Sequence, residues 1–131
     1  VKSIEKLNKI SPRNIRLEII SGKSHKELNE IFNAGDCLLL TSLHEGSPNI
    51  VKEAMATNLP IVSVACGDVR ERLKDVENSY VIESYSSEGL AHACLKVIEN
   101  DSRSNGRIKL LNQELDSDSV AIKIHNLLLS L

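Results

Sequence analysis

Apolar residues along the chain follow two different spacings. Short continuous runs, of which Leu38-Leu39-Leu40 is the clearest, are typical of strands buried on both faces, and such runs recur near residues 61 and 80. Between the runs, apolar residues recur every three or four positions, which is the period of an amphipathic helix. Strands that alternate with helices predict a parallel sheet covered by helices. We therefore expect an α/β fold with a doubly wound parallel sheet, followed by C-terminal helices.

Capping and turn residues set the expected boundaries of these elements. Ser24 and Glu27 form a capping box, which predicts the start of a helix. The run 15–20 alternates apolar and polar residues before it becomes apolar, so we expect a partly covered strand there. The expected strands are 15–20, 37–41, 60–65 and 79–83, and the expected helices are 1–10, 24–33, 48–57, 68–74, 86–100, 102–115 and 118–130.

Composition excludes several classes of function. The 131 residues are enough for one domain, and 41% of them are hydrophobic. A net charge of −2 gives no electrostatic reason to expect nucleic acid as a partner, and 2% aromatic residues offer no stacking surface for single strands. No apolar run approaches the roughly 20 residues that a transmembrane helix needs.

The cysteines give no indication of a metal site. They are Cys37, Cys66 and Cys94, and no pair has the C-x2-C spacing of a zinc site. Cys37 is expected in a strand and Cys94 on an apolar helix face, where cysteine acts as a small buried residue. An odd number of cysteines suits a reducing cytoplasm. With no cluster of carboxylates either, we expect neither a metal nor a cofactor.

Two glutamates flank a short polar segment between two expected strands. Glu45 lies in the loop after the first strand, and Glu53 follows in the next expected helix. Gly46 gives this loop little side-chain bulk. Ser47 is the expected N-cap, with Pro48 at the first helical position, where its missing N–H costs nothing. The free N–H groups of this helix start would point toward any bound anion.

A helical wheel places Glu53 outside the apolar stripe of its helix. Glu53 lies on the same flank as Asn49, so it can face a cleft beside the sheet without being buried in the core. The ordinary alternative is that Glu53 is a solvated helix residue and Glu45 a loop charge. The Gly-Ser-Pro helix start between two strands favours a functional site. The stripe itself consists of Ile50, Val51, Ala54 and Met55.

This region resembles a known family. The stretch from Leu40 to Asn49, followed by Glu53-Ala54-Met55-Ala56 and by Leu59-Pro60-Ile61-Val62-Ser63, is similar to the C-terminal, donor-binding domain of GT-B glycosyltransferases. The likeness is to the large retaining group called family 4, or group 1, especially its bacterial polysaccharide-building members. It extends over nearly all of the chain from about Ile15 onward, and the E-x7-E block is its specific part.

The resemblance implies a role for each candidate residue. Glu53 would hydrogen-bond the ribose hydroxyls of a nucleotide-sugar donor. Glu45, the candidate catalytic residue, would lie close to the donor sugar. These roles suit the chemistry, because a carboxylate accepts hydroxyl hydrogens and a helix N-terminus suits phosphate oxygens. One loop would approach the sugar and the diphosphate through its backbone, and its residues are Gly46, Ser47, Pro48 and Asn49.

A turn after the strand 60–65 holds a further candidate. Gly67 is expected to adopt a backbone conformation that a residue with a Cβ atom would resist. A donor-binding role and an ordinary strand-to-helix turn are equally open for Gly67. Arg70 and Arg72 could supply positive charge near phosphates or could simply be solvated.

The implied activity is transfer of a sugar from a UDP- or GDP-type nucleotide sugar to a glycan or lipid-linked acceptor. Retention at the anomeric carbon and a role in polysaccharide or cell-surface glycan biosynthesis follow from the same likeness. Most such enzymes need no divalent metal for donor binding. We expect a cytoplasmic protein, and any peripheral attachment to the inner face of the membrane would be carried outside these residues.

The resemblance also implies that residues 1–131 form a single, incomplete domain. Enzymes of this architecture have two Rossmann-like domains with catalysis between them, and the Arg and Lys that neutralise the diphosphate lie in the first units of the second domain. Nothing before Ile15 resembles those units. We therefore expect that two strands are absent and that the chain alone is inactive. The missing N-terminal domain or an upstream chain would be a required partner.

Two alternatives remain open. Sugar-nucleotide epimerases share the architecture, and a non-catalytic fragment or binding module that needs an upstream partner chain would have the same residues. A signalling receiver domain is disfavoured, because it needs an aspartate at the end of a strand and Asp36 precedes its expected strand.

Overall fold

The computed structural model describes residues 2–130, and strands and helices alternate in it between Leu38 and Asn100. The strands β1 (Leu38–Leu40), β2 (Ile61–Val64) and β3 (Tyr80–Ile82) pair in parallel in the order β1-β2-β3. The expected α/β class, a partial Rossmann-like fold with C-terminal helices, is confirmed. The helices are α1 (Lys2–Ile10), α2 (His25–Ala34), α3 (Asn49–Ala56), α4 (Val69–Arg72), α5 (Ser87–Asn100), α6 (Gly106–Asn112) and α7 (Ser117–Leu129).

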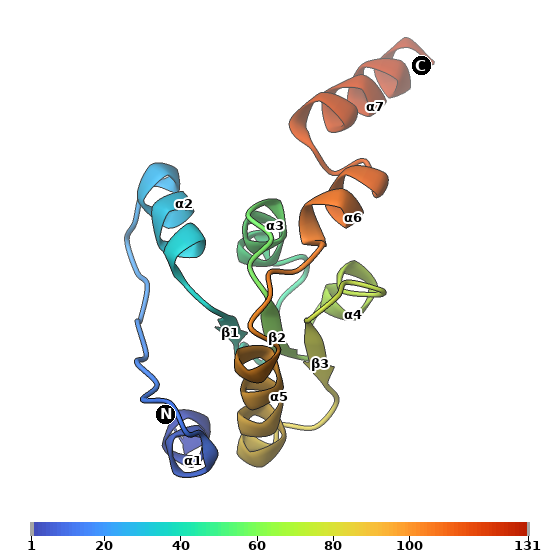
Figure 1. Cartoon of the computed structure of the whole chain (residues 1–131). Coiled ribbons are helices and arrows are strands. Elements are labelled where there is room, and N and C mark those ends of the chain that lie inside the picture. Colours follow the sequence, from blue (N-terminus) through green and yellow to red (C-terminus); the bar gives the residue numbers. More distant parts are fainter. Residues whose placement is uncertain (1, 131) are drawn as a thin grey trace.

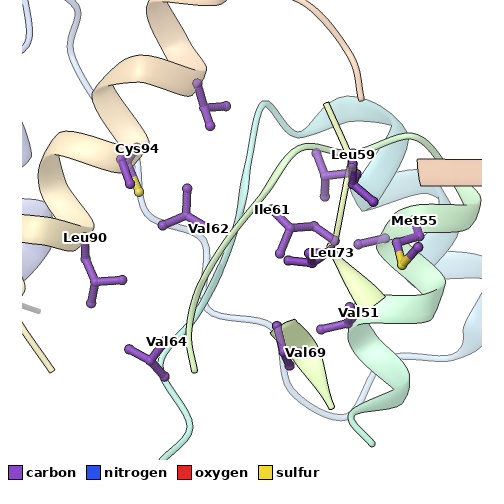
Figure 2. Close-up of a cluster of buried hydrophobic side chains, with 14 of the residues drawn as sticks. Val51, Met55, Leu59, Ile61, Val62, Val64, Val69, Leu73, Leu90 and Cys94 are labelled. Atoms are coloured by element: carbon purple, nitrogen blue, oxygen red, sulfur yellow. The ribbon is translucent and has the colours of Figure 1, made fainter. Parts of the chain in front are cut away.

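Strand β2 is the centre of the core. All of its residues are buried, and its side chains alternate between the two faces of the sheet. Val62 and Val64 point toward Leu90 and Cys94 of α5, whereas Ile61 points to the other side, toward Met55 of α3 (Figure 2). A sheet covered by helices on both faces explains why β2 is apolar along its whole length apart from Ser63.

The helices lie in two layers around this sheet. Helices α1 and α5 pack against each other on one side, and α3 and α6 pack together on the other (Figure 1). The close approach of α3 and α6 depends on Gly106, because a Cβ atom there would lie 2.9 Å from the Met55 Cα. Helix α7 projects away from the sheet, and none of its described residues is buried (Figure 1).

Local capping explains where several helices begin. The Ser24 hydroxyl accepts a hydrogen bond from the Glu27 N–H, and the Glu27 carboxylate accepts one from the Ser24 N–H at 2.9 Å, so the predicted capping box is confirmed. These hydrogen bonds, led by the one from the Ser24 backbone, lower the pKa of Glu27. The Ser86 hydroxyl caps α5 by accepting a hydrogen bond from the Gly89 N–H at 3.1 Å.

Arg103 ties the ends of two helices together. Its guanidinium donates hydrogen bonds to the carbonyls of Phe32 at 2.8 Å and Gly35 at 2.7 Å, at the end of α2. It also donates to the carbonyl of Thr57 at 3.1 Å, at the end of α3. Carbonyls at the C-terminal end of a helix have no intrahelical donor, so Arg103 both satisfies these three and fixes α2 beside α3.

The predicted strand 15–20 is wrong. This segment has no strand structure and runs separately from the sheet between α1 and α2 (Figure 1). Its alternating pattern is that of a strand, but a strand also needs a partner for its backbone groups. Within the described residues, the hydrogen bonds that anchor this segment come from the Asn8 side chain, which binds both the N–H and the carbonyl of Ile15.

Candidate functional site

The helix that follows Glu45 begins without a side-chain cap. Pro48, not Ser47, occupies the N-cap position, with φ −66° and ψ 117°, so the predicted Ser47 cap is wrong. Pro48 is buried and offers no side-chain acceptor to the first turn. The Val51 N–H donates to the Pro48 carbonyl at 3.1 Å, whereas the N–H groups of Asn49 and Ile50 have no hydrogen bond within residues 2–130. Helix α3 therefore presents free donors at its N-terminus.

A close backbone contact holds the preceding loop in place. The Asp68 N–H donates a hydrogen bond to the Gly46 carbonyl at 3.0 Å. Gly67 has φ +53°, and a Cβ atom built on it would lie 2.1 Å from the Gly46 carbonyl oxygen and 2.6 Å from that of Glu45. The turn after β2 therefore packs directly on the loop after β1. The expected special conformation of Gly67 is confirmed, and two separate candidate segments are brought together.

Gly46 has the opposite surroundings. No heavy atom lies within 4 Å of a Cβ atom built on Gly46, and its backbone is not in the left-handed region. Folding alone therefore does not require glycine at this position. Space is kept open on the outer side of the loop, where Ser47 and Asn49 are also exposed.

Glu45 is exposed above a buried thiol. Burial raises the pKa of the Cys66 thiol, the negative charges of Glu45 and Asp68 raise it further, and a hydrogen bond with Ser63 acts in the opposite direction. A thiol with a raised pKa is held in its protonated form, in which it is a poor nucleophile. The Glu45 carboxylate remains accessible from solvent.

Glu53 lies about one turn farther along α3 than Asn49 and faces α2. Its Oε1 lies 3.3 Å from the Nδ1 of His25, and its side chain retains 32% exposure. The expected position beside the apolar stripe is correct, because Val51, Ala54 and Met55 are buried while Glu53 is not. Sequence reasoning missed His25, since no local pattern links it to a residue so far along the chain.

Glu53 lines a cavity of about 540 Å³ between α2, α3 and α6. Lys52 and Arg107 contribute cations to its wall. The residues of the Glu45–Asn49 loop do not line this cavity. The structure thus places the candidate residues on one helix and the loop before it, but the Glu53 carboxylate and the Glu45 loop do not share one cavity within residues 2–130.

The arginines after Gly67 are already paired. Arg70 forms an ion pair with Glu83, and the Arg72 Nε donates to the Asp68 Oδ2 at 2.8 Å. Neither residue therefore brings an uncompensated positive charge to the loop. No group of three or more His, Cys, Asp or Glu side chains that could hold a metal ion occurs in the described part of the chain. Within the same residues, no helix has both the length and the apolar character to cross a membrane.

Comparison with known proteins gives the family. The model of a family described as "Glycosyl transferases group 1" matches residues 3–100. Because this match covers well over half of the chain, the protein belongs to the group 1 glycosyltransferase family. The resemblance inferred from the E-x7-E block is thereby confirmed, and glycosyl transfer is the general activity of the class.

Two curated proteins match shorter stretches. The D-inositol 3-phosphate glycosyltransferase of Corynebacterium aurimucosum is 25% identical over 87 residues, which are 66% of this chain and 21% of that protein. The 4-hydroxy-tetrahydrodipicolinate reductase of Caldanaerobacter subterraneus subsp. tengcongensis is 30% identical over 81 residues, 54% of this chain and 32% of that protein. The chain thus spans about a third or less of these relatives. No solved structure matches it significantly.

The contact between Gly67 and Gly46 predicts that the two glycines respond differently to substitution. Gly67→Ala combines a strained positive φ with a clash against backbone oxygens, so we expect it to lower the free energy of unfolding by about 1–3 kcal/mol. Gly46→Ala meets open space and should change that free energy by less than about 0.5 kcal/mol. Urea denaturation followed by circular dichroism measures both. Equal stability of the two variants would contradict the packing of this turn on the loop.

Proposed function

We propose that this chain is the donor-binding part of a glycosyltransferase that uses a UDP- or GDP-type nucleotide sugar. The donor sugar is transferred, with retention at the anomeric carbon, to a glycan or lipid-linked acceptor in the synthesis of a polysaccharide or cell-surface glycan. The observation that carries this proposal is the uncapped start of α3, held beside the Gly67 turn. In an open α/β sheet, ligands bind at the carboxyl ends of the strands, where this loop lies.

The diphosphate is assigned to the backbone of the loop and of the first turn of α3. The N–H groups of Asn49 and Ile50 are free, and the dipole of the helix adds a favourable field for an anion, about 0.3–1 kcal/mol per contact of this kind. The absence of a side chain at Gly46 lets phosphate oxygens approach the backbone closely. Ser47 and Pro48 shape the same loop, and Gly67 positions it.

The ribose is assigned to Glu53. Its carboxylate is half-buried, so hydrogen bonds to hydroxyl groups are stronger there than in open water. The nucleotide base would then lie toward the loop before α2, against backbone. On this assignment the ribose hydroxyls compete with His25 for the carboxylate, and the exposed imidazole is free to move aside.

Glu45 is assigned to the donor sugar. It lies in the loop ahead of the diphosphate contacts, and its carboxylate is accessible to a ligand above the loop. The diphosphate is the leaving group, so stabilising its developing charge is the main task of the site. Arg70 and Arg72 are already paired with carboxylates, so neither is assigned to the diphosphate. The cations that stabilise the diphosphate are assigned to upstream polypeptide. No divalent metal is assigned to the site. The chain alone is then inactive and binds donors weakly.

We expect Glu53 to contribute to donor affinity. In the protein completed with its upstream polypeptide, Glu53→Gln should weaken binding of the matching nucleoside diphosphate at least about tenfold, because a charge-assisted hydrogen bond is worth about 1.5–3 kcal/mol. The matched control is Glu30→Gln, at an exposed position of α2. Isothermal titration calorimetry with UDP and GDP measures both variants. Unchanged affinity in Glu53→Gln would remove the ribose assignment.

For Glu45 we expect an effect on turnover rather than on nucleotide affinity. Glu45→Gln should lower kcat about 100-fold while the affinity for the nucleoside diphosphate stays within about twofold. NMR analysis of the sugar products checks the reaction class in the same assay. A transferase releases the nucleoside diphosphate only when an acceptor is present, whereas an epimerase converts the nucleotide sugar without one. A non-catalytic binding module would bind the donor but would catalyse neither transfer nor epimerisation.

A further inference from the structure

Two of the three cysteines lie on the same face of the sheet. Cys37 directly precedes β1, and Cys94 lies in the middle of α5. Val62 of β2 points toward Cys94 (Figure 2). Leu39 of β1 is the partner of Val62 in the parallel register, so its side chain lies on that face too. Because side chains alternate along a strand, the Cys37 side chain shares the face of Leu39, which is the face that α5 covers.

A hydrogen bond joins the two thiols. The S–H of Cys37 donates to the sulfur of Cys94, and this contact lowers the pKa of Cys94, although burial acts in the opposite direction. The same hydrogen bond raises the pKa of Cys37, and burial raises it further. The Leu38 carbonyl is a second acceptor for the Cys37 thiol, at 3.4 Å. Cys94 is therefore the better nucleophile of the pair, and Cys37 lies beside it as a proton donor.

A cavity beside β1 gives access to the pair. Both Cys37 and Cys94 line this cavity of about 770 Å³, and apolar side chains such as Leu7, Ile31 and Val97 predominate in the rest of its wall. Cys94 is buried, whereas Cys37 is only half-buried, so the cavity reaches solvent on the Cys37 side. A small uncharged oxidant such as hydrogen peroxide suits this path, because it carries no charge into apolar surroundings.

The third cysteine lies at the other end of the sheet. Cys66 follows the carboxyl end of β2, whereas Cys37 precedes the amino end of β1, and the two strands are parallel. Cys66 is not among the residues that line the cavity beside β1. It therefore offers a matched control, since it is a buried thiol of the same chain that is remote from the pair.

We propose that Cys37 and Cys94 form a reversible disulfide bond that clamps the start of β1 to α5. The Cys94 thiolate attacks one oxygen of hydrogen peroxide and becomes a sulfenic acid, and the departing hydroxide takes up a proton to become water. The Cys37 sulfur then attacks the sulfenic sulfur, and the sulfenic hydroxyl leaves with the Cys37 proton as a second water. The two thiols together lose two electrons, and the peroxide gains them. A dithiol reverses the change by two successive thiol–disulfide exchanges.

Peptide mapping tests the bond without a sugar donor, so its result is separate from that of the proposed function. The chain of residues 1–131 and its Cys66→Ser variant are treated with a small excess of hydrogen peroxide, free thiols are alkylated, and a non-reducing digest is analysed by mass spectrometry. We expect a peptide pair joined through Cys37 and Cys94 in both proteins, and its disappearance after dithiothreitol. A disulfide through Cys66, a disulfide between two chains, or a Cys37 and a Cys94 that are not joined would each overturn the proposal.

Thermal unfolding shows whether the folded chain accommodates the bond. A disulfide that closes a long loop stabilises a protein when its geometry fits the fold and destabilises it when the fold must distort. We expect oxidation to raise the Tm of the chain and of Cys66→Ser by at least about 5 °C. Cys37→Ser, at a half-buried position, should show no rise on oxidation. Each protein is compared with its own reduced form, so any cost of the substitution itself cancels. A lower or unchanged Tm of the oxidised chain would contradict the proposal.

Discussion

The backbone contact between the Gly67 turn and the Glu45–Gly46 peptides is the constraint on which the candidate site depends. A Cβ atom at Gly67 would lie 2.1 Å from the Gly46 carbonyl oxygen, so a side chain at this position would push the two loops apart. The hydrogen bond from the Asp68 N–H to the same carbonyl completes the contact. Because a Cβ atom on Gly46 would meet open space, the loop is held by the turn after β2 rather than by packing of a side chain at that position.

The parallel sheet explains why these loops meet. Strands β1 and β2 are neighbours that run in the same direction, so the segments that follow them emerge at the same end of the sheet. The core formed by β2 with α3 and α5 fixes that end of the molecule, and α3 leads directly out of the Glu45 loop. Free amides, an exposed carboxylate and a half-buried carboxylate are thus carried by one loop and one helix.

Much of this arrangement could be predicted from the sequence because it depends on local patterns. The order of helices and strands, the Ser24 capping box and the position of Glu53 beside the apolar stripe all follow from spacing along the chain. Segment 15–20 could not be predicted in this way, since its pattern is that of a strand while strand formation depends on a partner elsewhere. The sequence pattern predicted Ser47 as the N-cap, but Pro48 occupies that position in the structure. The contact of His25 with Glu53 joins residues that are far apart in the sequence, so no local pattern could predict it.

The central claim is that the start of α3 binds the diphosphate of a sugar donor, and NMR tests it most directly. In the protein completed with its upstream polypeptide, titration with UDP and with GDP is followed by the chemical shifts of the backbone amides. We expect the amides of Gly46, Asn49 and Ile50 to shift together and to saturate with one of the two nucleotides. Saturable binding that moves amides elsewhere and leaves these three unchanged would contradict the central claim.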